Sequence, residues 1–291
     1  MNPIVILGSN GQVGYQLKKD FSKKYFIHAL SKDDCDISNI NHLTNTLEKL
    51  NPSIVINAAA FTDVDGAEKN PSNAYKINAE SVENLSKLSH HLNFTLIHFS
   101  TDYVFNKSSF EAICENEALN PINIYGNSKL LGENAILKYA ERFYIFRISW
   151  VYGRHGKNFP KTIIKLAREK EEIKIVNDQF GSPTSTFLIS HVLDQIVDMH
   201  LNKSVNKFGI YHLSPNEYCS WFDIGKVILQ KFKNNPEFRL KKIIPTTSEE
   251  FASVAKRPNF SYLDNSKIKK SFGIKINNWM HYLNEFLKYY D

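Results

Sequence analysis

The stretch Ile4-Val5-Ile6-Leu7-Gly8-Ser9-Asn10-Gly11-Gln12-Val13-Gly14 decides the fold of this chain. Its four apolar residues predict a short buried strand, and the residues from Tyr15 to Lys24 have the pattern of a helix with one apolar face. Glycines between a strand and a helix permit a tight turn and bring backbone N–H groups close to a ligand at the helix N-terminus. A pyrophosphate is the ligand typical of such a turn. The stretch therefore predicts a dinucleotide-binding unit, with G-x-x-G-x-x-G spacing.

Apolar runs and helical patterns alternate along the rest of the first half. The runs predict strands at residues 26–30, 54–56, 95–99 and 144–148, and a further strand is expected at 208–213. This alternation predicts an α/β fold with a doubly wound parallel sheet. We expect residues 1–149 to form the dinucleotide-binding domain, completed by 185–213, and residues 150–184 and 214–291 to form a smaller α/β lobe that binds substrate.

Composition excludes several classes of protein. The chain has 291 residues, 42% of them hydrophobic and 23% charged, which is typical of a globular protein. Its net charge of +6 is dispersed, whereas nucleic-acid binding favours a clustered basic stripe. Three cysteines without a CxxC pair argue for reduced thiols and against a zinc site. No apolar run reaches the ~18–20 residues of a membrane span. With no signal peptide before the first strand, we expect a cytoplasmic protein that binds neither membrane nor nucleic acid.

Two side chains of suitable chemistry lie four residues apart in Tyr125-Gly126-Asn127-Ser128-Lys129. On a helix this spacing puts the phenol and the ammonium on one face, one turn apart. A nearby cation favours the phenolate, so we expect Lys129 to lower the pKa of Tyr125 toward neutrality. Thr101 directly follows a predicted strand, in the position where an open parallel sheet places its ligand crevice. These residues predict a catalytic site.

Together, the glycine turn, Thr101 and the Tyr125–Lys129 pair resemble the extended short-chain dehydrogenases/reductases, which have a Rossmann-type sheet. Four longer motifs are similar to those of the dTDP-4-dehydrorhamnose reductase family, and Arg257-Pro258 fits the same pattern. The motifs are Asn57-Ala58-Ala59-Ala60-Phe61-Thr62-x-Val64-Asp65-x-Ala67-Glu68, Ser100-Thr101-Asp102-Tyr103-Val104-Phe105, Phe146-Arg147-x-Ser149-Trp150-Val151-Tyr152 and Asn177-Asp178-Gln179-x-Gly181-x-Pro183-Thr184.

The resemblance implies that hydride from NAD(P)H reduces the C4 keto group of a nucleotide-linked 4-keto-6-deoxyhexose, most simply dTDP-4-dehydro-L-rhamnose. Tyr125 would donate the proton, Thr101 a hydrogen bond, and Lys129 would also bind the nicotinamide ribose. The implied cofactor-binding residues are Gly8, Asn10, Gly11, Gln12, Val13, Gly14, Ser31, Lys32, Asp36, Ile37, Ala58, Ala59, Ala60, Asn78, Tyr125 and Lys129. The implied substrate-binding residues are Thr62, Val64, Thr101, Asp102, Trp150, Asn177 and Arg257.

The end of the second predicted strand bears on the choice of cofactor. An acidic residue there accepts hydrogen bonds from the ribose 2′-OH of NADH. Here the position falls near Ser31, which is neutral, and Lys32 follows, so we predict NADPH with NADH tolerated. Asp33 and Asp34 lie close enough that a small shift of the strand boundary would favour NADH.

The sequence carries weaker signals for metal binding and oligomeric state than for the cofactor site. Some relatives place a metal-binding Glu shortly after the Pro-Thr of the fourth motif, where this chain has Ser185-Thr186-Phe187. We therefore predict no metal site, and a monomer or a homodimer without a metal bridge.

Two other functions stay open. One is a different sugar-nucleotide enzyme, an epimerase or a dehydratase, although dehydratases of this superfamily carry Asp-Glu after the Thr and this chain has Asp102-Tyr103. The other is a non-catalytic cofactor-binding regulatory subunit, such as the subunit of methionine adenosyltransferase built on this reductase fold. Retention of Thr101, Tyr125 and Lys129 together argues against it.

Overall fold

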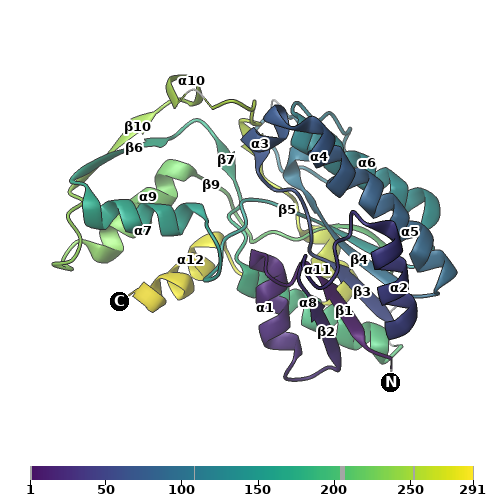
Figure 1. Ribbon diagram of the computed structural model, residues 1–291. Helices are drawn as coiled ribbons and strands as arrows, with labels where there is room; N and C mark the ends of the chain where they lie inside the picture. Colours follow the sequence, from purple (N-terminus) through teal and green to yellow (C-terminus); the bar gives the residue numbers. More distant parts are fainter. Residues whose placement is uncertain (1, 108, 204–206, 252, 291) are drawn as a thin grey trace.

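A six-stranded parallel sheet forms the centre of the computed structural model, which describes residues 2–107, 109–203, 207–251 and 253–290 (Figure 1). Every neighbouring pair of strands runs parallel. In spatial order the strands are β2 (Ile27–Leu30), β1 (Ile4–Leu7), β3 (Ile54–Asn57), β4 (Thr95–Thr101), β5 (Phe143–Ile148) and β8 (Gly209–His212). The order reverses between β1 and β3, so the predicted doubly wound sheet is confirmed.

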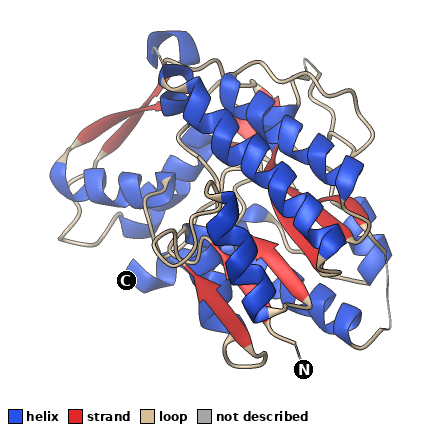
Figure 2. Ribbon diagram, turned by 45° about the vertical axis from the view of Figure 1, so that its right-hand side comes forward, coloured by secondary structure: helices blue, strands red, loops and turns tan. Residues whose placement is uncertain are grey.

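Helices cover both faces of the sheet, because successive residues of a buried strand point to opposite sides (Figure 2). One face packs against α1 (Gln12–Phe21), α8 (Thr186–Leu201) and α11 (Ser266–Phe272). The other packs against α2 (Ile40–Leu50), α5 (Ser81–His91) and α6 (Ile124–Tyr139).

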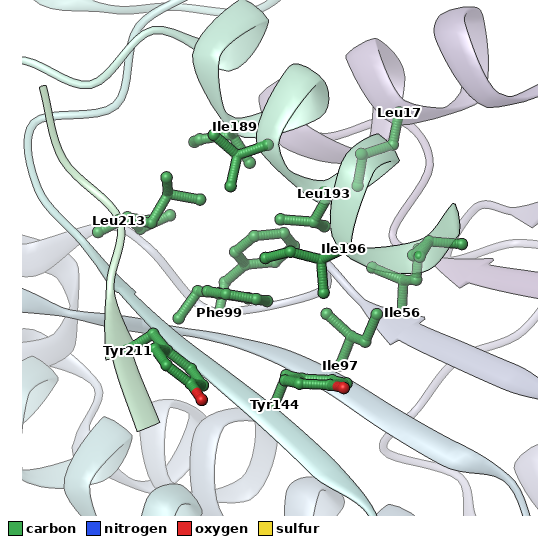
Figure 3. Packing of buried hydrophobic residues seen from close by; sticks show 14 of the residues in the cluster. Leu17, Ile56, Ile97, Phe99, Tyr144, Ile189, Leu193, Ile196, Tyr211 and Leu213 are labelled. Carbon is green, nitrogen blue, oxygen red and sulfur yellow. The ribbon is translucent and has the colours of Figure 1, made fainter. Parts of the chain in front are cut away.

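The core on the α8 side is aliphatic and aromatic (Figure 3). Ile97 and Phe99 of β4 reach from the sheet toward Leu193 and Ile196 of α8. Each of these side chains is at most 7% exposed. This burial fixes α8, and with it the segment that leads out of the smaller lobe, on the sheet.

A smaller lobe lies beside the sheet, on the left in Figure 1. Its strands form a parallel pair and a three-stranded sheet in which β7 lies between its neighbours. The strands are β6 (Glu172–Val176), β10 (Lys242–Thr246), β7 (Phe180–Gly181), β9 (Cys219–Ser220) and β11 (Phe260–Ser261). The helices are α7 (Phe159–Glu169), α9 (Trp221–Phe232), α10 (Ser248–Phe251), α12 (Trp279–Leu287) and the 3-10 turn η3 (Lys288–Tyr290).

The packing supports the predicted division of the chain, which stays a prediction at its exact boundaries. β8 and α8 belong to the central sheet and its cover, as expected for 185–213. One segment departs from the expectation for 214–291. Ile268 and Phe272 of α11 are buried in the core of the sheet, not in the core of the lobe.

Two segments add short helical elements, and the predicted position of Thr101 after its strand needs correction. The loop after β3 enters α3 (Val64–Lys69), where the side chain of Asp63 caps the first turn. The chain from Pro71 forms α4 (Pro71–Tyr75), a π-helical turn η1 (Lys76–Glu80) and α5 in succession. β4 continues to Thr101, so Thr101 lies within the strand and the 3-10 turn η2 (Asp102–Val104) follows. Among the described residues, no helix combines the length and apolarity needed to cross a membrane.

We expect Leu193→Ala to lower the free energy of unfolding by about 2–5 kcal/mol, because it opens a cavity between α8 and the sheet. The control is Phe187→Ala on the same helix, where the side chain is 57% exposed; its effect should stay within about 0.5 kcal/mol. Urea unfolding followed by circular dichroism measures both. Equal losses in the two variants would contradict this account of the packing.

Candidate functional site

A cavity of about 420 Å³ opens at the carboxyl ends of the central strands. Twelve of the predicted site residues line it. They are Gly11, Gln12, Val13, Ala58, Ala60, Thr62, Val64, Thr101, Asp102, Tyr125, Lys129 and Trp150. The sheet thus brings together side chains that lie up to 139 positions apart in the sequence.

The glycine turn between β1 and α1 is too tightly packed for side chains. Gly8 has φ +77°, and a Cβ atom there would lie 2.6 Å from the backbone nitrogen of Ala59. A Cβ atom on Gly14 would overlap the carbonyl oxygen of Gly8. The turn is closed by Gly11 N–H, which donates to Gly8 O at 3.0 Å. Bare backbone at the N-terminus of α1 fits the pyrophosphate of a dinucleotide.

A second cavity of about 210 Å³ continues from the turn toward the end of β2. The predicted cofactor residues Gly8, Asn10, Gly11, Lys32, Asp36, Ile37, Ala58, Ala59 and Ala60 line it. Cys35 and Ile77 add apolar surface that sequence reasoning missed.

Ser31 does not line this second cavity, although it was expected to. It is buried, and both its N–H and its hydroxyl donate to Oδ2 of Asp34, at 2.9 and 2.6 Å. These hydrogen bonds to Asp34 close the turn over Ser31. The exposed Lys32, and not Ser31, lines the cavity.

Tyr125 lies in the first turn of α6, which begins where Oδ1 of Asn123 accepts a hydrogen bond from Gly126 N–H at 2.7 Å. Burial raises the pKa of the Tyr125 phenol to about 12, and a hydrogen bond with Thr101 opposes the shift only in part. The expected lowering of this pKa by Lys129 is therefore wrong. A phenol with a raised pKa keeps its proton at neutral pH, as a proton donor must.

Thr101 and Asp102 face the same cavity from the end of β4. The Thr101 hydroxyl donates to Oδ1 of Asp102 at 3.0 Å and accepts from Tyr103 N–H at 3.2 Å. Burial raises the pKa of Asp102 to about 6, against hydrogen bonds from Ser261 and Thr101. Its other oxygen, Oδ2, is buried without a protein partner, so a polar ligand atom in the cavity would be well placed to meet it.

Lys129 is 2% exposed, and its Nζ atom is hydrogen-bonded to β4. Nζ donates to the carbonyl oxygen of Phe99 at 2.6 Å and lies 3.1 Å from Nε2 of His98. Burial lowers the pKa of Lys129 to about 8, while the charge of Glu133 acts in the opposite direction. Sequence reasoning missed His98, although a histidine inside an apolar strand was a signal.

Besides Gly14 and Ser31, three predicted site residues lie outside both cavities. Asn78 is buried and its amide bonds Phe61 N–H, Phe61 O and Ser128 Oγ, so it fixes a loop to α6. Asn177 is exposed beyond β6. Arg257 lines a separate cavity of about 500 Å³, where it donates to Oδ2 of Asp65 at 3.0 Å.

Trp150 lines the first cavity together with Trp221, which sequence reasoning missed. The two indole rings are stacked, with centroids 3.6 Å apart. Trp150 has φ +47°, and Gly181 leaves the space that its ring fills. Trp221 comes from α9 of the smaller lobe, so the pair joins that lobe to the end of β5. Lys157, Tyr103 and Val151 also line the cavity.

Within the described ranges, no three His, Cys, Asp or Glu side chains are placed to hold a metal ion. That the protein needs no metal ion stays a prediction.

Comparison with known proteins gives consistent matches over the full chain. A family model described as the RmlD substrate binding domain matches residues 1–291. The dTDP-4-dehydrorhamnose reductase of Escherichia coli (strain K12) is 36% identical over 285 residues, which cover 95% of this chain and 94% of the relative. The spore coat polysaccharide biosynthesis protein SpsK of Bacillus subtilis (strain 168) is 33% identical, covering 99% and 98%.

A crystal structure of dTDP-4-dehydrorhamnose reductase from Bacillus anthracis str. Ames, in complex with NADP, is similar throughout. It has a TM-score of 0.92 and 34% identity and covers 99% of both chains.

Proposed function

This chain belongs to the RmlD family, to which the dTDP-4-dehydrorhamnose reductases belong, and on that premise we propose that it reduces dTDP-4-dehydro-L-rhamnose to dTDP-L-rhamnose with NADPH. One observation carries the proposal. Thr101, Tyr125 and Lys129 line the same cavity as the glycine turn, so a proton donor faces the place where a dinucleotide would end.

The residues around the glycine turn fit a dinucleotide. We assign the pyrophosphate to the turn at Gly8, Gly11 and Gly14, and the adenosine to the cavity between Lys32 and the Ala58–Ala60 wall. When bound, NADPH supplies the hydride. A relative of 34% identity was crystallised with NADP, which supports this choice.

Tyr125 is the proposed acid. Reduction of a ketone builds negative charge on its oxygen, and the protonated phenol neutralises that charge as the carbon–hydrogen bond forms. The Thr101 hydroxyl lies beside the phenol and would exchange its bond to Asp102 for one to the substrate oxygen. Lys129, held in a single position by Phe99 O, places a second donor group at the same end of the cavity.

The sugar would lie between Thr62, Val64 and the Trp150–Trp221 pair, where flat apolar surface faces polar groups of β4. Arg257 lines the separate cavity of about 500 Å³, and its guanidinium is suited to a diphosphate. The hydrogen bond to Oδ2 of Asp65 orients this guanidinium.

The direct test is to give the purified protein NADPH and dTDP-4-dehydro-L-rhamnose and to identify the product by NMR. We expect NADPH oxidation with equimolar dTDP-L-rhamnose. Oxidation of NADPH by a different 4-keto sugar nucleotide, with none by this one, would replace the substrate assigned here. Absence of turnover with all such substrates would refute the reductase.

Tyr125→Phe should lower kcat by about 10²–10⁴-fold, because it removes the proton donor and almost no volume. Binding of NADPH, followed by fluorescence, should persist. Tyr139→Phe makes the same change at the far end of α6 and should leave kcat unaltered. If Tyr125→Phe kept more than half of the activity, another group would have to be the acid.

Lys32→Ala should lower kcat/KM for NADPH by about two- to fivefold, as expected for an exposed ion pair worth roughly 0.4–1 kcal/mol. The value for NADH should stay the same, because only the 2′-phosphate of NADPH gains from the cation. Lys49→Ala removes a comparable exposed charge at the end of α2 and is the control. If Lys32→Ala lowered kcat/KM for NADPH and NADH equally, Lys32 would not recognise the 2′-phosphate.

A further inference from the structure

His98 is a buried imidazole between two elements of the candidate site. It lies in β4 directly opposite Asn57 of β3, on the sheet face that α6 covers. His98, Asn57 and Lys129 are 0%, 1% and 2% exposed. A polar group buried to this degree is stable only if its hydrogen bonds are satisfied, so the direction of each bond is informative.

The orientation of Asn57 follows from its backbone neighbour. Ala59 N–H donates to Oδ1 of Asn57 at 3.1 Å, which identifies the amide oxygen. The amide nitrogen therefore faces Nδ1 of His98, at 3.1 Å. An amide NH₂ group only donates, so Nδ1 of His98 must accept.

A neutral imidazole with an accepting Nδ1 carries its proton on Nε2. That Nε2–H faces Nζ of Lys129 at 3.1 Å. An ammonium has no lone pair and cannot accept this proton, whereas a neutral amine can accept it and still donate to Phe99 O. The chain of bonds from Ala59 to Lys129 is complete only with the neutral amine.

We propose that His98, oriented by Asn57, is a positioning residue that favours the neutral amine of Lys129 and so sets the pH at which the active-site lysine takes up its proton. Neither residue needs to touch substrate or cofactor for this role. The inference concerns the same site as the proposed function but does not depend on the substrate.

The other charged groups around Lys129 do not prevent His98 from acting on the protonation of the lysine. Glu133, one turn along α6, favours the ammonium, but Arg147 of β5 donates to both its carboxylate oxygens, at 2.9 and 2.7 Å. Asp102 lies across the cavity beside Thr101, and Tyr125 stays neutral. Burial, and then the charge of Lys129, lower the pKa of His98 well below its ordinary value, so His98 stays neutral too.

The tautomer of His98 can be observed directly. We would record ¹H–¹⁵N long-range correlation spectra of the ligand-free protein with ¹⁵N-labelled histidine, using His98→Gln only to assign the signal. We expect a neutral ring protonated at Nε2 at about pH 9, where the amine of Lys129 is mostly neutral. A ring protonated at Nδ1, or an imidazolium, would overturn the proposal.

The effect of His98 on the protonation of Lys129 is tested by titrating the ¹³Cε signal of the lysine in variants of Asn57. Lys129→Met serves to assign this signal. Asn57→Asp would accept from both Ala59 N–H and Nδ1–H, so His98 would present an accepting Nε2 to the ammonium. The midpoint of Lys129 should rise by about one pH unit or more. Asn57→Leu, which adds no charge, should shift it in the same direction.

The control is Asn127→Asp, which adds a carboxylate at an exposed position of α6. The titration midpoint of Lys129 should then move by less than about 0.3 pH unit, because solvent screens the charge. Unchanged midpoints in both Asn57 variants would overturn the proposal. If those variants fail to fold, the wild-type tautomer still decides it.

A kinetic consequence rests on the proposed function. If the ammonium of Lys129 returns the proton that Tyr125 spends in each turnover, kcat of reduction falls as pH rises through about 8, and this limb moves upward in Asn57→Leu. A shifted lysine midpoint without a shifted kinetic limb would refute the proton-return role of Lys129 and leave the assignment of His98 intact.

Discussion

The bond from Lys129 Nζ to the carbonyl oxygen of Phe99 joins α6 to the end of β4, and the geometry of the candidate site depends on it. A buried lysine is tolerated only where its nitrogen is hydrogen-bonded, so this contact fixes both the rotation and the height of α6 on the sheet. Tyr125, one turn earlier, is thereby held beside Thr101. The strand that anchors the lysine thus also presents the hydrogen-bonding hydroxyl.

The parallel sheet explains why so many distant segments meet at one cavity. β1, β3, β4 and β5 all end on the same side, and each contributes the residues just at or beyond its carboxyl end. Close packing of Gly8 against Ala59 leaves bare backbone for a dinucleotide. The smaller lobe adds Trp221, whose stack on Trp150 gives the cavity a flat apolar wall. Bare backbone for a dinucleotide beside a flat apolar wall fits a family whose relatives are named as reductases of a sugar nucleotide.

The sequence predicted those parts of the fold and site that depend on local pattern. The strands of the central sheet, the glycine turn and the Tyr125–Lys129 spacing are periodic or local features, and the structure has them. Trp221 was not predicted, because its place beside Trp150 depends on how the lobe packs against the sheet. Ser31 was misplaced, because a side-chain bond to Asp34 turned it inward. The pKa of Tyr125 was wrongly expected to fall, because spacing on a helix says nothing about burial or about the competing partner, Phe99 O.

The central claim, that the Tyr125 and Thr101 hydroxyls act on the C4 oxygen of the sugar, is tested most directly by a crystal structure with NADP and dTDP-L-rhamnose. The account predicts the C4 hydroxyl within hydrogen-bond distance, about 2.6–3.2 Å, of the Tyr125 oxygen. It also predicts the sugar between Val64 and the Trp150–Trp221 pair. A sugar bound with its C4 hydroxyl directed away from Tyr125, while NADP occupies the glycine turn, would contradict the account.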